Sequence, residues 1–140
     1  MTQIQPFHLA IPVAALEPSR TFYREILGCE EGRSSDHWVD FNFFGHQLVL
    51  HVSADKKKEK NHNPVDGKSV PVPHFGVVLK MEDFDQLAAR LKSEGISFVI
   101  EPYIRFKGKA GEQATMFFQD PDGNALEFKA FKNIAQLFAT

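Results

Sequence analysis

Apolar and polar residues alternate along two stretches of the chain, 7–13 and 74–80, and each stretch is predicted to form a β-strand. In both, the apolar side chains share one face, and a histidine near the start, His8 or His74, lies on the other. A helical pattern follows each strand and ends at a glycine, 20 residues after the first histidine and 21 after the second. The histidines lie 66 residues apart, so the chain contains an internal repeat.

Three short strands are predicted after each helix, and they complete two similar modules. They lie near 29–33, 37–43 and 46–53 in the first module and near 97–104, 114–120 and 125–131 in the second. The sequence therefore predicts an α+β fold with modules over about 6–54 and 74–131. Residues 55–73, rich in lysine, asparagine and proline, are predicted to be a solvated linker. Residues 132–140 form a short tail, expected to dock on the body as a helical turn.

A tight turn over residues 120–124, Asp-Pro-Asp-Gly-Asn, is predicted to lead into the last strand. Proline presets the backbone for such a turn, and Gly123 and Asn124 can supply a positive φ. In the strand that follows, Glu127 lies on the face opposite the apolar side chains. A carboxylate is thus expected beside a rigid corner, on the polar face of the sheet.

Two imidazoles and one carboxylate form the candidate site. If the modules pack with pseudo-twofold symmetry, His8, His74 and Glu127 converge in a shared cavity. This set is the facial triad of non-haem Fe(II) proteins, with open positions for water, substrate or O₂, and it also suits Zn, Ni or Mn. A single histidine or glutamate on a strand is more often an ordinary hydrogen-bonded or solvated residue. The coincidence of repeat position, facing and turn is what favours a metal site.

Composition excludes several other classes of protein. The chain has 140 residues, 43% of them hydrophobic, which suffices for one compact domain with a sizeable core. A net charge of -2 gives no basis for binding nucleic acid or an anionic membrane. No apolar run approaches the ~20 residues of a membrane span, and the N-terminus lacks the features of a signal peptide. With a single cysteine, Cys29, an internal disulfide is impossible, and we expect a cytoplasmic protein.

Two further residues are candidates for catalysis. His51 is predicted to face the cleft, where it is a base, a fourth metal ligand or a structural histidine. Tyr103 shares a strand face with Arg105, at the start of a segment rich in lysine and glycine, 105–113. This segment is either a mobile cationic lid that attracts an anionic substrate or a simple solvated loop. We take His51 and Tyr103 as the candidate catalytic residues.

Several stretches resemble the vicinal oxygen chelate superfamily, and together they cover nearly the whole chain. Segments 7–13 and 20–28 resemble the opening of such a module, and segments 74–78 and 118–128 resemble its second half. The superfamily contains glyoxalase I, extradiol ring-cleaving dioxygenases, fosfomycin-resistance transferases and bleomycin-binding proteins. The Asp-Pro-Asp-Gly turn and the glutamate after it are the most specific mark. Segments 38–47 and 101–108 resemble a branch of small extradiol-type dioxygenases.

The resemblance implies two βαβββ modules that curl one eight-stranded mixed sheet around a metal cleft. His8, His74 and Glu127 would be the ligands, Fe(II) the first choice of metal, and Zn, Mn or Ni the alternatives. The implied activity is an extradiol-type dioxygenase acting on a catechol-like small molecule, in a homodimer. The alternatives are a glyoxalase-type lyase or isomerase and a metal-free binding protein of the bleomycin-resistance kind.

One position departs from the glyoxalase I pattern. Glyoxalase I has a fourth ligand, a carboxylate, on the last strand of its first module. The corresponding strand here, 47–51, has no acid, and Gln47 or His51 could take the place. Loss of that carboxylate weakens the case for glyoxalase chemistry, in which a metal-bound glutamate acts as the base.

Overall fold

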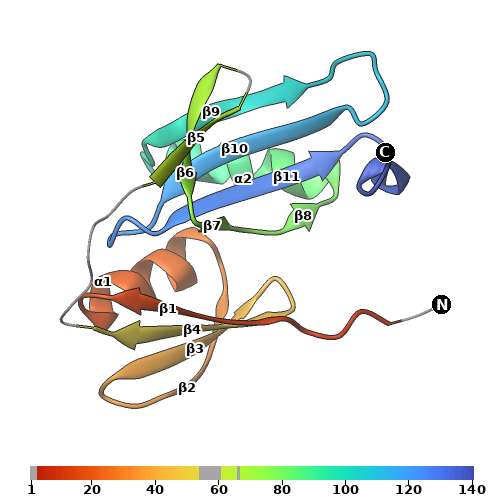
Figure 1. Cartoon of the computed structure of the whole chain (residues 1–140). Coiled ribbons are helices and arrows are strands. Elements are labelled where there is room, and N and C mark those ends of the chain that lie inside the picture. Colours follow the sequence, from red (N-terminus) through yellow and green to blue (C-terminus); the bar gives the residue numbers. More distant parts are fainter. Residues whose placement is uncertain (1–2, 54–60, 66) are drawn as a thin grey trace. The chain divides into compact units, whose positions relative to one another are not determined.

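The computed structural model describes residues 3–53, 61–65 and 67–140, and the chain divides into two compact units, 1–58 and 59–140. Both units are α+β, as the sequence predicts, with a four-stranded sheet in the first and a five-stranded sheet in the second (Figure 1). Because the units are described separately, a single eight-stranded sheet stays a prediction. No helix among the described residues has the length and apolar character needed to cross a membrane.

The first unit, called unit 1, packs one helical segment on one sheet. Its elements are β1 (His8–Val13), α1 (Leu16–Thr21), which continues as the π-helical η1 (Phe22–Ile26), β2 (Glu30–Ser34), β3 (Trp38–Phe43) and β4 (His46–Val52). The strand order is β1-β4-β3-β2, with β1 parallel to β4 and the other pairs antiparallel. Tyr23 is fully buried and its ring lies 5.8 Å from that of Phe41 and 6.4 Å from that of Phe43. These aromatic contacts fix the helix on the sheet.

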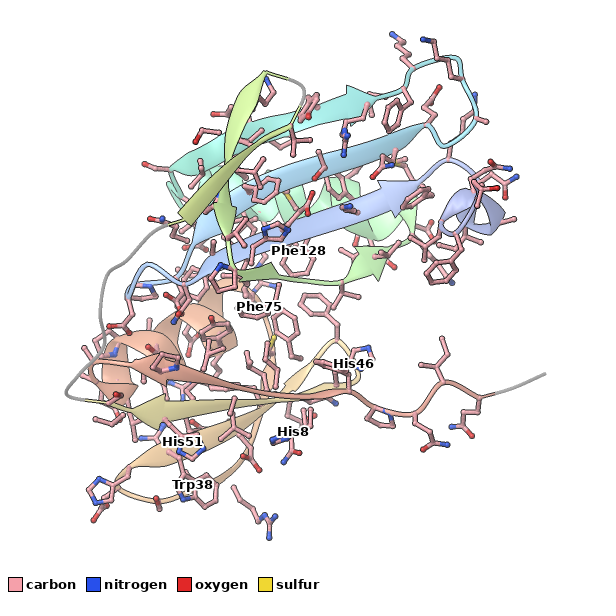
Figure 2. All side chains as sticks on the ribbon, in the orientation of Figure 1. His8, Trp38, His46, His51, Phe75 and Phe128 are labelled. Carbon is pink, nitrogen blue, oxygen red and sulfur yellow. The ribbon has the colours of Figure 1, made fainter. Side chains whose placement is uncertain are left out.

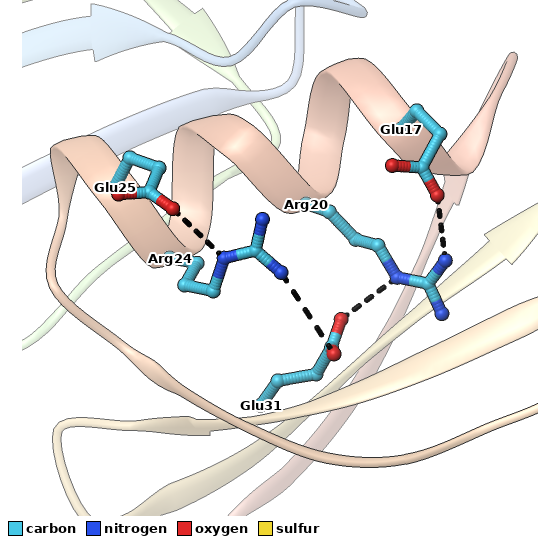
Figure 3. A network of polar contacts seen from close by, with 5 residues as sticks. All are labelled: Glu17, Arg20, Arg24, Glu25 and Glu31. Atoms are coloured by element: carbon cyan, nitrogen blue, oxygen red, sulfur yellow. Dashed lines mark hydrogen bonds and ion pairs between the residues drawn. The ribbon is translucent and has the colours of Figure 1, made fainter.

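Charged residues join the helical segment to β2 (Figure 3). The guanidinium of Arg20 donates to Glu17 and to Glu31, each at 2.7 Å, and Glu31 lies 4.0 Å from Arg24. The hydrogen bond with Glu17, followed by the bond with Glu31, raises the pKa of the Arg20 guanidinium. The network fixes the edge strand of the sheet against the helix, on the protein surface.

The second unit, called unit 2, repeats this order of elements after an additional hairpin. Its elements are β5 (Asn61–Val65), β6 (Lys68–Val72), β7 (His74–Phe75), β8 (Val78–Leu79), α2 (Met81–Ser93), β9 (Phe98–Arg105), β10 (Gln113–Gln119), β11 (Ala125–Phe131) and η2 (Ile134–Gln136). The strand order is β7-β11-β10-β9, and β8 also pairs with β11. Since the first strand of each module lies parallel to the last, the internal repeat predicted from the sequence is confirmed.

The predicted linker is wrong in its second part. Residues 61–65 and 68–72 form an antiparallel hairpin, while residues 54–60 lie outside the described residues. The hairpin lies over β9 and β10 in Figure 1, and the buried Val70 packs against Ile100 and Phe117. This packing explains the error, because the partners of Val70 lie far along the chain and leave no mark on the local sequence.

Three smaller predictions differ from the structure in detail. The strand predicted over 74–80 is divided into β7 and β8, with Gly76 between them. The tail does form the helical turn η2, followed by the half-buried Leu137, but Ile134 and Phe138 are 61% and 89% exposed and do not dock. Within the turn, Gly123 has a φ of 82° whereas Asn124 does not adopt a positive φ.

Candidate metal centre

Unit 2 brings together two of the three predicted ligands, His74 and Glu127. His74 on β7 pairs with Ala125 on β11, so the histidine and Glu127 lie on the same face of adjacent parallel strands. The Nε2 atom of His74 lies 3.2 Å from Oε1 of Glu127. The Glu127 side chain is only 9% exposed, whereas that of His74 is 30% exposed. An imidazole nitrogen and a carboxylate at this distance either share a proton or bind a cation.

The turn before β11 fixes the register that carries Glu127. The buried Asp120 accepts from the backbone N–H groups of Asp122 and Asn124, both at 2.9 Å, and from the Asn124 side chain at 2.8 Å. Strands β10 and β11 pair symmetrically about this turn, which places Glu127 opposite Phe117. The turn over residues 120–124 therefore acts as a rigid connection that orients the Glu127 carboxylate.

The strand that carries His74 passes close to the backbone of Glu127. A Cβ atom at Gly76 would lie 1.6 Å from the carbonyl oxygen of Glu127, closer than any real contact. Only glycine fits here, which explains why the strand is interrupted after His74 and Phe75. The close approach of the two backbones brings the imidazole within reach of the carboxylate.

Three neighbours define the surroundings of this pair. The hydroxyl of Thr115 donates to Oε2 of Glu127, and Lys129 Nζ lies 3.9 Å from Oε1. The ring of Phe117 meets the ring of His74 edge-on, with centroids 5.0 Å apart. One carboxylate oxygen is therefore bound by a hydroxyl, while the other faces the imidazole and an ammonium group beside an apolar wall.

The tautomer of His74 follows from its other nitrogen. Nδ1 of His74 lies 2.7 Å from the carbonyl oxygen of Pro71 at the end of the hairpin. A carbonyl only accepts hydrogen bonds, so Nδ1 carries the proton and Nε2 is the nitrogen that can ligate a metal. This arrangement is the usual one for a metal-binding histidine, whose second nitrogen donates to a carbonyl or carboxylate.

The third predicted ligand, His8, belongs to unit 1. It pairs in register with Gln47, and its Nδ1 lies 2.8 Å from Gln47 Oε1. Gln47 Nε2 in turn donates to Asp40 Oδ2 at 3.2 Å. His8 and Gln47 are exposed on the surface of the sheet. The neighbour of His8 on the last strand of the module is therefore Gln47 and not His51.

His51 and Tyr103 lie at different places on the two sheets. His51 is on the same face of unit 1 as His8, but it pairs with Pro12 and Trp38, four residues or about 13 Å along β4 from Gln47. His8, Trp38 and His51 can be followed on this sheet in Figure 2. Tyr103 pairs with Thr115 and thus shares the face of Glu127 in unit 2. Lys68 Nζ lies 4.8 Å from the centre of the Tyr103 ring.

The donor set fits a divalent cation. Two donor atoms of one coordination sphere are about 3 Å apart when each bond is about 2.1 Å, close to the 3.2 Å between His74 and Glu127. Within residues 3–53, 61–65 and 67–140, no three His, Cys, Asp or Glu side chains are gathered to hold a metal ion. The predicted triad takes His8 from unit 1 and the other ligands from unit 2, so it stays a prediction.

Sequence reasoning missed three residues that lie beside the candidate ligands or their partners: Thr115, Pro71 and Asp40. The signal for Thr115 was present, because counting back symmetrically from the turn places it on the face of Glu127. Pro71 contributes a backbone carbonyl, which no residue type reveals. Asp40 lies on β3, next to β4, and only the register of these two strands places it near Gln47.

Comparison with known proteins gives consistent matches over most of the chain. The family model described as "Glyoxalase/Bleomycin resistance protein/Dioxygenase superfamily" matches residues 5–128. The glutathione transferase FosA of Serratia marcescens is 27% identical over 133 residues, which are 94% of this chain and 84% of that protein. A glyoxalase/bleomycin resistance protein/dioxygenase from Alicyclobacillus acidocaldarius is 34% identical, with a TM-score of 0.80 over 96% of each chain. A lactoylglutathione lyase from Agrobacterium tumefaciens, 17% identical, shares the fold with a TM-score of 0.67 over 100% of each chain.

Proposed function

The chain belongs to the glyoxalase/bleomycin resistance protein/dioxygenase superfamily, and we propose that it is a divalent-metal enzyme with His8, His74 and Glu127 as its protein ligands. The observation that carries the proposal is the pair in unit 2. His74 Nε2 faces Glu127 Oε1 at 3.2 Å, while its Nδ1 is hydrogen-bonded to the carbonyl oxygen of Pro71. A histidine that ligates a metal through Nε2 commonly donates from Nδ1 to a carbonyl in this way.

The residues around the pair have distinct roles in this proposal. A divalent cation bound here supplies Lewis-acid activation of two adjacent substrate oxygens and, as Fe(II), a position for O₂. Thr115 holds one carboxylate oxygen of Glu127, which leaves the other as the ligand atom. Phe117 provides an apolar wall that excludes water beside His74. Tyr103, on the same face, is our candidate for moving a proton at its hydroxyl oxygen.

Among the reactions of the superfamily, we propose extradiol-type cleavage of a catechol-like compound by an Fe(II) enzyme. The residue opposite His8 on the last strand of the module is Gln47, and an amide cannot act as the base that glyoxalase chemistry needs. Three protein ligands leave positions for both substrate oxygens and O₂. The match to a glutathione transferase favours a second candidate, transfer of glutathione to a small molecule by the same centre.

Metal content tests the ligand set. We expect His8→Ala, His74→Ala and Glu127→Ala each to lose bound Mn²⁺ or Fe(II), measured by elemental analysis after gel filtration, with the circular dichroism spectrum unchanged. His37→Ala is the matched control, because this histidine is exposed and lies in the loop before β3. A variant that keeps the wild-type metal content removes its residue from the ligand set. If the wild-type protein retains no metal at all, the binding-protein alternative replaces the enzyme.

Turnover tests the reaction. Protein loaded anaerobically with Fe(II) is mixed with aerated buffer and a panel of catechols, and O₂ consumption is recorded with an electrode. We expect consumption that is absent in Glu127→Ala. No consumption across the panel rules out the dioxygenase, and the Mn²⁺ form is then assayed for loss of glutathione thiol with electrophilic small molecules.

We also expect a homodimer, which the molar mass from light scattering checks.

A further inference from the structure

Three polar side chains form a chain across adjacent strands of unit 1. Asp40 lies on β3, Gln47 on β4 and His8 on β1, and β4 is the middle strand of the three. The Gln47 amide connects the other two, with its nitrogen 3.2 Å from Asp40 Oδ2 and its oxygen 2.8 Å from His8 Nδ1. All three lie on one face of the sheet: His8 pairs directly with Gln47, and Asp40 pairs with Val49, two residues along β4 on the same side.

The direction of each hydrogen bond in this chain is determined by its first member. An ionised carboxylate only accepts hydrogen bonds, so Asp40 requires the NH₂ group of Gln47 to face it. The carbonyl oxygen of Gln47 then faces His8, and this oxygen also only accepts. His8 must therefore donate from Nδ1, which leaves the lone pair on Nε2. An amide alone can flip and offer either end, so Asp40 is needed to set the order.

We propose that Asp40 and Gln47 are positioning residues that hold His8 as the Nδ1–H tautomer with Nε2 free to bind the metal ion. The expected effect of this arrangement on metal affinity rests on the proposed function, whereas the tautomer of His8 does not. Unit 2 reaches the same result for His74 with the Pro71 carbonyl, which cannot flip. In unit 1 the side-chain amide of Gln47 takes the place of this carbonyl. In this inference Gln47 supports a ligand and is not itself a fourth ligand.

The tautomer is measured directly on the metal-free full-length protein. Two-bond ¹H–¹⁵N spectra, recorded where imidazoles are neutral, distinguish the protonated ring nitrogen from the bare one. We expect His8 to carry its proton on Nδ1 in the wild-type protein. Gln47→Ala and Asp40→Ala are expected to show a mixture of both tautomers. Wild-type His8 with the proton on Nε2 overturns the proposal, and so does an unchanged tautomer in Gln47→Ala.

Metal titration tests the coupling between the two positioning residues. Removal of a side chain that orients a ligand histidine lowers metal affinity about 10–100-fold, so we expect this loss of Mn²⁺ affinity by calorimetry for Gln47→Ala. Asp40→Ala alone is expected to lose affinity severalfold. In the Gln47→Ala background, however, Asp40→Ala is expected to change nothing, because Asp40 acts only through the amide. The control is Glu30→Gln, which removes an exposed carboxylate from the neighbouring edge strand β2.

The titration separates three outcomes. An equal loss from Asp40→Ala in both backgrounds, matched by Glu30→Gln, means that Asp40 acts as a distant charge, and this overturns the proposed relay. If the thermal midpoint of each variant falls in step with its Mn²⁺ affinity, Asp40 and Gln47 have a merely structural role, and this also overturns the proposal. If the wild-type protein binds no Mn²⁺, the proposed function fails, and the tautomer measurement alone then decides the role of Asp40 and Gln47.

Discussion

Thr115 shows how one hydroxyl determines the chemistry of a carboxylate. It is 1% exposed, and it donates to Oε2 of Glu127 on the neighbouring strand. The other oxygen, Oε1, is the one that faces His74 and Lys129. A buried hydroxyl with one charged acceptor contributes both to stability and to the orientation of a ligand.

We predict that Thr115→Val lowers both stability and metal affinity. Valine keeps the shape of threonine but leaves Glu127 with an unpaired oxygen, which costs about 1–3 kcal/mol of the free energy of unfolding. Urea denaturation of the metal-free protein measures this loss, and Mn²⁺ titration is expected to show about a tenfold weaker affinity. Thr115→Ser keeps the hydroxyl and should retain most of the affinity. Equal affinities in the valine variant and the wild type would exclude this role.

Gly76 is the second residue on which the site depends directly. An alanine methyl would lie 1.6 Å from the Glu127 carbonyl oxygen, so the two strands must separate. We predict that Gly76→Ala destabilises the protein by about 1–3 kcal/mol or more and displaces His74 from Glu127. Gly32→Ala is the control, since its new methyl would lie at ordinary contact distances from Asp40, 3.4 Å from Cβ and 3.7 Å from the carbonyl oxygen. Denaturation curves that coincide for both variants would contradict this reading of the backbone contact.

At the level of elements, the sequence predicts most accurately where contacts are local. The four apolar positions of α2, spaced as on one helix face, are all buried: Phe84, Leu87, Ala88 and Leu91. Strands β1, β4 and β11 were likewise predictable from alternation, whereas the strand predicted over 74–80 is divided into β7 and β8. The β5–β6 hairpin was not, because its buried residues Val70 and Pro71 lie in a short proline-rich stretch, which is more typical of a loop than of a strand. Its stability comes from Ile100 and Phe117, whose proximity only the folded chain creates.

The candidate site likewise combines residues that the local sequence reveals with residues that only the folded chain reveals. His8, His74 and Glu127 stand out by residue type and repeat position, whereas the groups that orient them are ordinary. A proline carbonyl, a buried threonine and a glutamine carry no chemical signature in a sequence. Their roles follow from strand register, and register depends on how the strands pair.

The turn before β11 is the element that transmits this register. Asp120 accepts three hydrogen bonds from Asp122 and Asn124. We predict that Asp120→Ala lowers the free energy of unfolding by about 2 kcal/mol or more, because two backbone donors lose their acceptor. Asp120→Asn retains one acceptor oxygen and should lose less. Equilibrium denaturation ranks the variants, and an alanine variant as stable as the wild type would mean that the turn forms without its aspartate.

At the level of the whole molecule, the repeat gives two compact units, each with its own sheet. Each pairs its first strand with its last, and each carries a histidine near the start of that first strand. Each unit also supplies an acceptor for Nδ1, an amide in unit 1 and a backbone carbonyl in unit 2. The proposed ligand set takes its donors from both units, so a bound ion would stabilise both units together.

This coupling gives a prediction for hydrogen exchange. Mn²⁺ at about 100 times its Kd stabilises the state that binds it by about 2.7 kcal/mol. We expect the slowest amides of β1 in unit 1 and of β11 in unit 2 to be slowed together by Mn²⁺, measured by hydrogen-exchange mass spectrometry. In His8→Ala neither set should change, because the remaining ligands bind too weakly. If Mn²⁺ still slows β11 in that variant, the ion needs only His74 and Glu127, and the shared site is wrong.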